Sequence, residues 1–210
     1  MRRFKNILFL FEDAIEADPA FDRAIDLAER NGARLGVVHC VEGLGPDDLA
    51  DDAAAAGWSG VKEAIATELE AMAALARARG IDVATNVLGG SPFREVITQV
   101  QRRGHDLVVK AARSPGGTRE MLFGSTDLHL MRKCPCPVWI HKDRAGANTY
   151  ARIMAAVDVG DTTHVGRHVS RFILDLATSL GQQDDSDVHV VHAWSSVGER
   201  MATAARRGLL

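Results

Sequence analysis

The sequence predicts an α/β fold in which an open, parallel five-stranded sheet carries helices on both faces and is followed by a partial second copy. Short apolar runs alternate with amphipathic stretches of helical period through short connections, the order that builds parallel sheets. The opening pattern then recurs: an apolar run closed by an acidic residue, a helix, and a second apolar run ending in Val-Val-His, at 37–39 and again at 190–192. A repeat of this length indicates a domain duplication. We therefore predict a complete unit at 1–147 and a partial one at 148–210.

Burial and capping signals define the first strand and helix. Ile7–Phe11 is a run of consecutive apolar residues, too short for a helix and typical of a strand buried on both faces. Asp18 followed by Pro19 predicts a helix N-terminus. Apolar residues then recur at helical spacing, and Gly32 marks the helix end. Leu35–Val41 is predicted to be a second buried strand.

The rest of the first unit continues the alternation. Residues 42–60 are polar, acidic and glycine-bearing, so they are predicted to form a loop with at most one helical turn, at 53–56. Residues 114–117 form a second predicted loop. The remaining elements, in chain order, are a long helix from Val61 to Ala76 ahead of Gly80, a strand at Ile81–Leu88, a helix from Pro92 closed by Gly104, a strand at Leu107–Val109, a helix at Gly124–Lys133 and a strand at Val138–His141.

The second unit contains only the beginning of this pattern. Its predicted elements are a polar linker at 144–149, an apolar strand closed by Asp158, a helix with a stripe from Val169 to Leu180 that stops at Gly181, a strand at 188–192 and a basic, solvated tail at 198–210. Two strands and a helix do not complete a five-stranded sheet, so apolar surface should remain exposed. We expect the first unit or another chain to cover it, which makes a homodimer the predicted assembly. The alternative is that the chain is a fragment of a longer protein.

Composition excludes several classes of protein. Apolar residues make up 46% of the chain and charged residues 25%, which suits a soluble globular protein. A net charge of -3 gives no basic footprint for nucleic acid. No apolar stretch approaches the ~20 residues of a membrane span, and the N-terminus lacks the apolar region of a signal peptide. Three cysteines, an odd number, argue against a disulfide framework and for a cytoplasmic protein.

One segment of the chain resembles a known family. The residues Asp106-Leu-Val-Val-Lys and the stretch from Leu122-Phe-Gly-Ser-Thr-Asp to Lys133-Cys-Pro-Cys-Pro-Val-Trp are similar to the C-terminal half of a universal stress protein domain, and more narrowly to the tandem E-type proteins. The resemblance covers 1–143 and resumes at 151. It implies a Rossmann-like fold, a role in surviving stress through a small ligand or protein partner, and domains that pack in pairs.

The resemblance also implies a ligand site that has lost key residues. Many family members bind ATP through the pattern G-x-x-G-x9-G-[ST] after the fourth strand, where glycines let backbone N–H groups reach the phosphates. Anchored on Gly124-Ser125, the two earlier glycine positions fall on Ala111 and Ser114. The aspartate expected after the first strand is Glu12, whereas the second unit keeps it as Asp158. We therefore predict a degenerate loop and no cofactor, with ATP binding as the alternative.

Ligands of open parallel sheets bind outside the carboxyl ends of the strands. The predicted ligand-binding residues are accordingly Glu12, Val41, Ala111, Ser114, Gly124, Ser125, Thr126 and Asp158. The turn at 124–126 can hold an anion, but it can equally cap a helix. We predict no catalytic residue. The alternatives are a slow ATP hydrolase, for which Asp127 is the carboxylate near the loop with nothing to position it, and an interaction module with a vestigial cleft.

Histidines and cysteines offer further hypotheses. The spacing of His129, Cys134, Cys136 and His141 suggests zinc, but a helix, a proline-locked turn and a strand end explain the same residues, so we predict no metal. His39 and His192 end equivalent strands and can face a ligand or hydrogen-bond a neighbouring segment. Cys40 is predicted to pack rather than to react.

Overall fold

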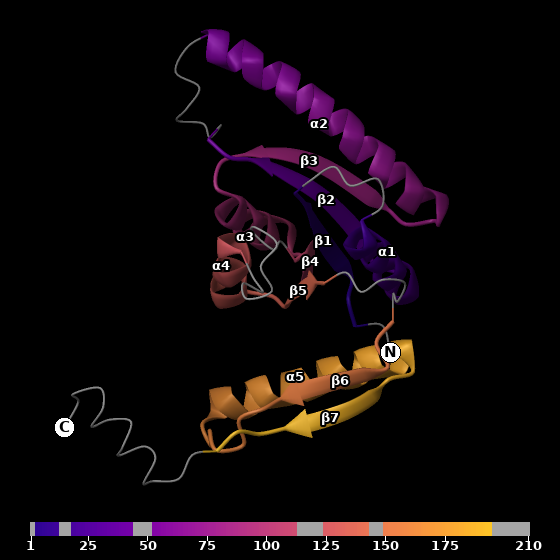
Figure 1. Ribbon diagram of the computed structural model, residues 1–210, viewed down its shortest axis with the longest axis vertical. Coiled ribbons are helices and arrows are strands. Elements are labelled where there is room, and N and C mark those ends of the chain that lie inside the picture. The colour runs from indigo at the N-terminus through magenta and orange to yellow at the C-terminus, as the bar shows by residue number, and fades with distance from the viewer. Residues whose placement is uncertain (1–2, 13–17, 44–51, 113–123, 143–148, 195–210) are drawn as a thin grey trace, which may run out of the picture. The chain divides into compact units, whose positions relative to one another are not determined.

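The structure is a computed structural model that describes residues 3–12, 18–43, 52–112, 124–142 and 149–194, without the side chains of 52–56. The chain divides into two compact units, Met1–Asn148 and Thr149–Leu210. Figure 1 shows the elements of both. The predicted loop at 114–117, the tail at 198–210 and most of the linker lie outside the described residues.

The first unit confirms the predicted fold class. Five parallel strands form one sheet in the order β3-β2-β1-β4-β5. The strands are β1 (Asn6–Phe11), β2 (Arg34–Val41), β3 (Val83–Gly89), β4 (Leu107–Ala111) and β5 (Val138–His141), and the helices between them are α1 (Pro19–Asn31), α2 (Asp52–Ala78), α3 (Pro92–Arg103) and α4 (Ser125–Lys133). The strand order reverses between β1 and β4, so a switch point lies at their carboxyl ends.

The central strand β1 is buried on both faces because helices cover each of them. Leu8 and Leu10 belong to a cluster that includes Val96 of α3 and Leu130 of α4. The alternate residue Phe9 lies against Phe21 of α1, with ring centroids 5.1 Å apart. Figure 1 shows α3 and α4 together on one side of the sheet and α1 on the other. Burial on both sides explains why β1 reads as a continuous apolar run.

Helix α1 begins and ends at the predicted residues. The Asp18 carboxylate accepts a hydrogen bond from the Ala20 N–H at 2.8 Å, which satisfies one of the free N–H groups of the first turn. Gly32 adopts the left-handed conformation (φ 60°), and its N–H bonds back to the last turn.

Helix α2 is longer than predicted, because residues 52–60 are helical rather than a loop. The alanines at 53–56 are the strongest helix formers, and each glycine costs only about 1 kcal/mol relative to alanine. Gly57 and Gly60 face open space, so they interrupt no packing. Farther along, Leu69 and Ala73 are fully buried and anchor the helix. The glycines in residues 42–60 therefore led to a predicted start of this helix, at Val61, that lies too late in the sequence.

The second unit is a two-stranded parallel sheet with one helix: β6 (Arg152–Ala156), α5 (His164–Asp184) and β7 (Asp187–Val191). The predicted stop at Gly181 is wrong, since α5 ends at Asp184 and Asp185 adopts the left-handed cap (φ 55°). Gly181 serves packing instead. A Cβ atom there would lie 2.7 Å from Cγ2 of Val188, so the missing side chain lets β7 approach the helix.

None of the helices in the described ranges has the length and apolar character needed to span a membrane.

Candidate functional site at the carboxyl ends of the strands

A buried charge cluster lies at the switch point of the first unit. The Lys110 ammonium, 1% exposed, is 2.8 Å from Oε2 of Glu12 and also pairs with Oδ1 of Asp127, which is 0% exposed. Glu12 follows β1, Lys110 lies in β4 and Asp127 is in the first turn of α4. We refer to Glu12, Lys110 and Asp127 as the lysine cluster. It joins the strands β1 and β4 to the start of α4.

Strand alternation places Lys110 in this cluster. Val108 and Lys110 are two residues apart on β4, so both side chains point to the face covered by α3 and α4. An unpaired ammonium would be costly at that depth, and the two carboxylates offset this cost. The sequence prediction ended the strand at Val109 and did not include Lys110 among the site residues. A lysine that directly continues a buried apolar run was the available signal.

Asp127 is held at both carboxylate oxygens. Oδ1 pairs with Lys110, and Oδ2 accepts the backbone N–H of Gly124 at 3.1 Å, which caps the start of α4. The expectation that nothing positions this carboxylate is therefore wrong. Ion pairing and capping immobilise it in a fully buried position.

The structure places most of the predicted site residues near this edge of the sheet. Ala111 ends β4, and Gly124 is the N-cap of α4, which Ser125 and Thr126 begin. Val41 ends β2, where its carbonyl accepts the Gly90 N–H at 3.0 Å. Ser114 lies outside the described residues.

The described residues do not fit the polyphosphate of ATP. The Gly124 N–H, which the family pattern would aim at a phosphate, donates to Asp127. The Lys110 ammonium already contacts two carboxylates, so the cluster carries one excess negative charge when all three groups are ionised. An incoming phosphate would meet like charge at this position.

The two strand-end histidines make the same hydrogen bond. Nδ1 of His39 lies 3.0 Å from the carbonyl oxygen of Phe11, and Nδ1 of His192 lies 3.1 Å from that of Val157. In each unit the histidine links its own strand to the end of the neighbouring strand. Of the two hypotheses for these residues, the structural one accounts for both rings.

In the second unit, Asp158 lines a cavity of about 520 Å³ at the carboxyl ends of β6 and β7. Its carboxylate accepts the Gly160 N–H at 2.9 Å and lies 3.9 Å from Nδ1 of His192. The opposite wall is apolar and comes from α5 through Val165 and Val169. The cavity thus combines an accessible carboxylate with an apolar surface.

A smaller cavity, of about 330 Å³, lies at the opposite, amino-terminal ends of β1, β2 and β3. Arg34, Arg103 and His105 line it, and burial lowers the pKa of His105. A Cβ atom on Gly36 would come 3.0 Å from Cε1 of His105, so the glycine makes room for the ring. The sequence analysis missed this cavity, although a glycine inside a buried strand signals a close approach.

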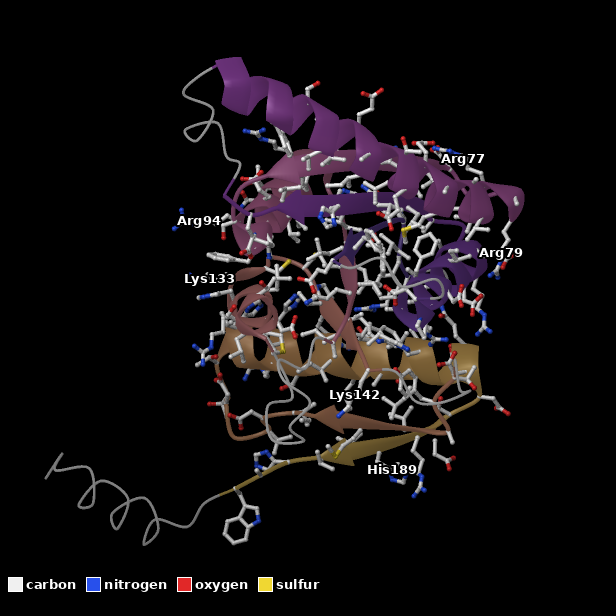
Figure 2. All side chains as sticks on the ribbon, turned by 45° about the horizontal axis from the view of Figure 1, so that its top comes forward. Arg77, Arg79, Arg94, Lys133, Lys142 and His189 are labelled. Carbon is white, nitrogen blue, oxygen red and sulfur yellow. The ribbon has the colours of Figure 1, made fainter. Side chains whose placement is uncertain are left out.

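The predicted zinc alternative is not supported by the geometry. Among the described residues, which include all four side chains in question, no three His, Cys, Asp or Glu groups come together to hold a metal. His129 instead stacks on Phe93, with centroids 4.4 Å apart. Arg94 and Lys133 also lie over the Phe93 ring, at 5.8 and 5.1 Å from its centroid, and Figure 2 shows both extending from the same side of the molecule. His129 thus joins α3 to α4.

Comparison with known proteins assigns the fold to a family. The sequence profile of the Universal stress protein family matches residues 3–142. The chain belongs to this family. Among relatives of the family, it is 24% identical over 200 residues to Universal stress protein E of Photorhabdus laumondii and 26% identical over 199 residues to that of Escherichia coli K12. Each match covers 92% of this chain and 63% of the relative, so the chain spans less than two thirds of their length.

Solved structures share the fold. A functionally unknown protein from Pseudomonas aeruginosa PAO1 matches 98% of this chain and 66% of its own, with a TM-score of 0.69 and 24% identity. A universal stress protein solved in complex with cAMP matches 66% of this chain and 97% of its own, with a TM-score of 0.51 and 17% identity.

Proposed function

We propose that the protein is a cytoplasmic, non-catalytic stress-response protein that acts by binding a small ligand or a protein partner. The lysine cluster carries this proposal. It occupies the switch point of the first unit with residues that bind one another, so the described residues at this position leave neither a free cation nor the Gly124 N–H for a phosphate. All three cysteines are free thiols, in keeping with a reducing compartment.

The rival function is slow ATP hydrolysis, with Asp127 orienting water or metal. That role requires an oxygen within reach of the reacting group. Asp127 is fully buried, and its two oxygens hold Lys110 and the Gly124 N–H. The geometry therefore favours a structural role for this carboxylate. Phosphate release above background that is abolished in Asp127→Ala would support the hydrolase instead.

We further propose that residues 148–210 are part of a second universal stress protein domain and that this unit offers the better ligand site. Asp158 stands where ATP-binding family members use aspartate for adenine or ribose, and its cavity has an apolar wall. A carboxylate beside an apolar surface suits a nucleoside, whose hydroxyls donate hydrogen bonds and whose base is flat and apolar on its faces. A relative crystallised with cAMP supports a ligand of this class.

The first experiment is mass spectrometry of small molecules released when the freshly purified protein is denatured, followed by calorimetric titration with ATP and with cAMP. We expect no ATP near one per chain and weak binding of a nucleoside-type ligand. Asp158→Ala should abolish that binding, whereas Arg103→Ser, in the other cavity, should leave it unchanged. Stoichiometric ATP that is retained in Asp158→Ala would show that the first unit binds it and would overturn the proposal.

The protein partner we propose is a second copy of the chain, or the first unit packing on the second. Met154, Val190 and Trp194 are large apolar side chains of the second unit that remain 72%, 57% and 80% exposed. Apolar surface of this kind marks an interaction site. Light scattering across the micromolar range should give a dimer mass, and Val190→Lys should shift it toward the monomer. A monomer throughout would leave only the intramolecular version.

A further inference from the structure

We propose that Cys134 and Cys136 form a redox site that hydrogen peroxide converts to an intrachain disulfide and that small thiols restore. The two sulfur atoms are 3.7 Å apart in the turn between α4 and β5. Both side chains are partly exposed, so an oxidant of the size of peroxide can reach them. Within the sequence Lys133-Cys-Pro-Cys-Pro, prolines on both sides of Cys136 hold the two thiols in this arrangement.

The pair is asymmetric in the way that a peroxide-reactive site requires. Either sulfur can donate in this contact; with the Cys136 thiol as the donor, the hydrogen bond stabilises negative charge on Cys134 and lowers the pKa of Cys134 to about 7. The same contact raises the pKa of Cys136 far above its ordinary value. Cys134 is thus the nucleophile and Cys136 the resolving thiol, the arrangement typical of redox-sensing cysteines.

The third cysteine provides an internal contrast. Cys40 lies one residue before the end of β2, packed against the core cluster, and burial raises its pKa to about 12. A thiol with that pKa is almost entirely protonated at neutral pH and is a poor nucleophile. Oxidation should therefore be confined to the pair.

The chemistry balances with one equivalent of peroxide. The Cys134 thiolate attacks one peroxide oxygen, the O–O bond breaks, and the leaving hydroxide takes a proton to become water. The resulting sulfenic acid on Cys134 is attacked by the Cys136 sulfur, which forms the S–S bond, while the thiol proton and the sulfenic hydroxyl leave as a second water. Two thiols lose two electrons and peroxide gains them. Two equivalents of a small thiol such as glutathione reverse the change through a mixed disulfide.

Formation of the Cys134–Cys136 disulfide requires only a local movement. The sulfur atoms must approach from 3.7 Å to a bond length of about 2.05 Å. The turn is held by backbone bonds on both sides, since the Cys134 N–H bonds to the Leu130 carbonyl and the Pro137 carbonyl accepts the Val108 N–H. A ring closed across a single proline is small and constrained, and such disulfides are the labile, easily reduced ones.

The test is a thiol count and peptide map of the full chain before and after one equivalent of hydrogen peroxide. We expect the free thiols to fall from three to one. The peptide carrying Cys134 and Cys136 should lose two hydrogens in mass, and dithiothreitol should restore three thiols. Three thiols after treatment, or a disulfide between two chains on a non-reducing gel, would overturn the proposal.

Variants separate the roles of the three cysteines. In Cys136→Ser, the sulfenic acid on Cys134 should persist and be trapped by dimedone, because no resolving thiol remains. Cys40→Ser is the matched control and should still lose two thiols. A disulfide that includes Cys40 in any variant would contradict the assignment. The wild-type peptide map decides the main question without any substitution.

Discussion

The same three residues, Val-Val-His, lie within β2 in the first unit (37–39) and at the end of β7 in the second (190–192), with different surroundings. Nδ1 of His39 lies 3.0 Å from the carbonyl oxygen of Phe11, the last residue of β1, and Nδ1 of His192 lies 3.1 Å from that of Val157, the residue after β6. Val37 is nevertheless 0% exposed, whereas its counterpart Val190 is 57% exposed. Local strand–helix–strand geometry therefore depends only on the local pattern. Burial depends on what packs on the strand: Val38 belongs to the cluster with α3 and α4, so Val37 lies on the other face, where α1 and α2 contact β2.

The charged residues after the two first strands differ in the same way. Glu12 contacts a buried lysine from a strand about 100 residues later in the chain, at 2.8 Å. Asp158 is 72% exposed, accepts the Gly160 N–H at 2.9 Å in an exposed contact and lies 3.9 Å from Nδ1 of His192. The first unit closes its switch point with its own side chains, while the second leaves its carboxylate accessible. Substitutions at matched positions can test this contrast.

The largest effect is expected at the lysine cluster. Lys110→Met leaves two carboxylates without their cation in a buried position, which should lower the free energy of unfolding by about 3–5 kcal/mol. The matched change in the second unit, Asp158→Asn, removes an exposed charge and should stay within about 0.5 kcal/mol. Urea unfolding of both variants measures the difference. Similar small losses would mean that the cluster adds no specific stability.

A core position should give the next largest difference. Leu8 is fully buried, so Leu8→Ala should cost about 2–5 kcal/mol. Met154 holds the matching place on β6 but is 72% exposed, and Met154→Ala should cost less than about 0.5 kcal/mol. Hydrogen exchange of the backbone amides in β1 and in β6 measures the two effects separately. A large loss of protection in Met154→Ala would indicate that a partner chain covers β6 in solution.

Glycines in the long helices should respond with opposite signs. Gly181→Ala places a Cβ atom 2.7 Å from Val188, so it should destabilise the second unit by about 1–3 kcal/mol. Gly57→Ala enters open space in α2 and should stabilise that helix by about 0.5–1 kcal/mol. Exchange protection of α5 and α2 measures the two changes. Recovery of α5 in Gly181→Ala/Val188→Ala would identify the clash as the cause.

The smallest expected effect is the loss of stability on removing a helix N-cap, and it should be equal in the two units. Asp18 caps α1 and Thr163 caps α5, with hydrogen bonds of 2.8 and 3.0 Å to backbone N–H groups. Replacing either by alanine should cost about 1 kcal/mol. Exchange in the first turn of each helix is the readout. A clear inequality would show that capping, like burial, depends on what surrounds the unit.

Signals with a local physical cause were predictable from the sequence. The buried strand Ile7–Phe11, the N-cap Asp18 and the left-handed Gly32 all act within a few residues, and each appears where expected. Gly181 is the residue type that commonly ends a helix, but here it allows the close contact between α5 and β7. That contact is not encoded in the local sequence pattern. The start of α2 was missed because glycines with no packing neighbours do not break a helix.

The candidate site was predictable only in part. The carboxyl ends of parallel strands were a sound place to look, and Glu12, Ala111 and Gly124 lie there. Lys110 was missed because a charged residue is expected to end a buried strand rather than to continue it. Its partner Asp127 is 17 residues away in sequence, and only the fold brings the two together.

The central place of β1 in the sheet also has a consequence for synthesis. β1 ends at Phe11, yet one of its neighbours, β4, begins at Leu107 and the edge strand β5 ends at His141. At about 5–20 residues per second, translation from β1 to the end of β5 takes on the order of 10 s. Until β4 has been made, one edge of the apolar strand β1 has no partner strand, and an unpaired apolar edge of this kind is prone to aggregation.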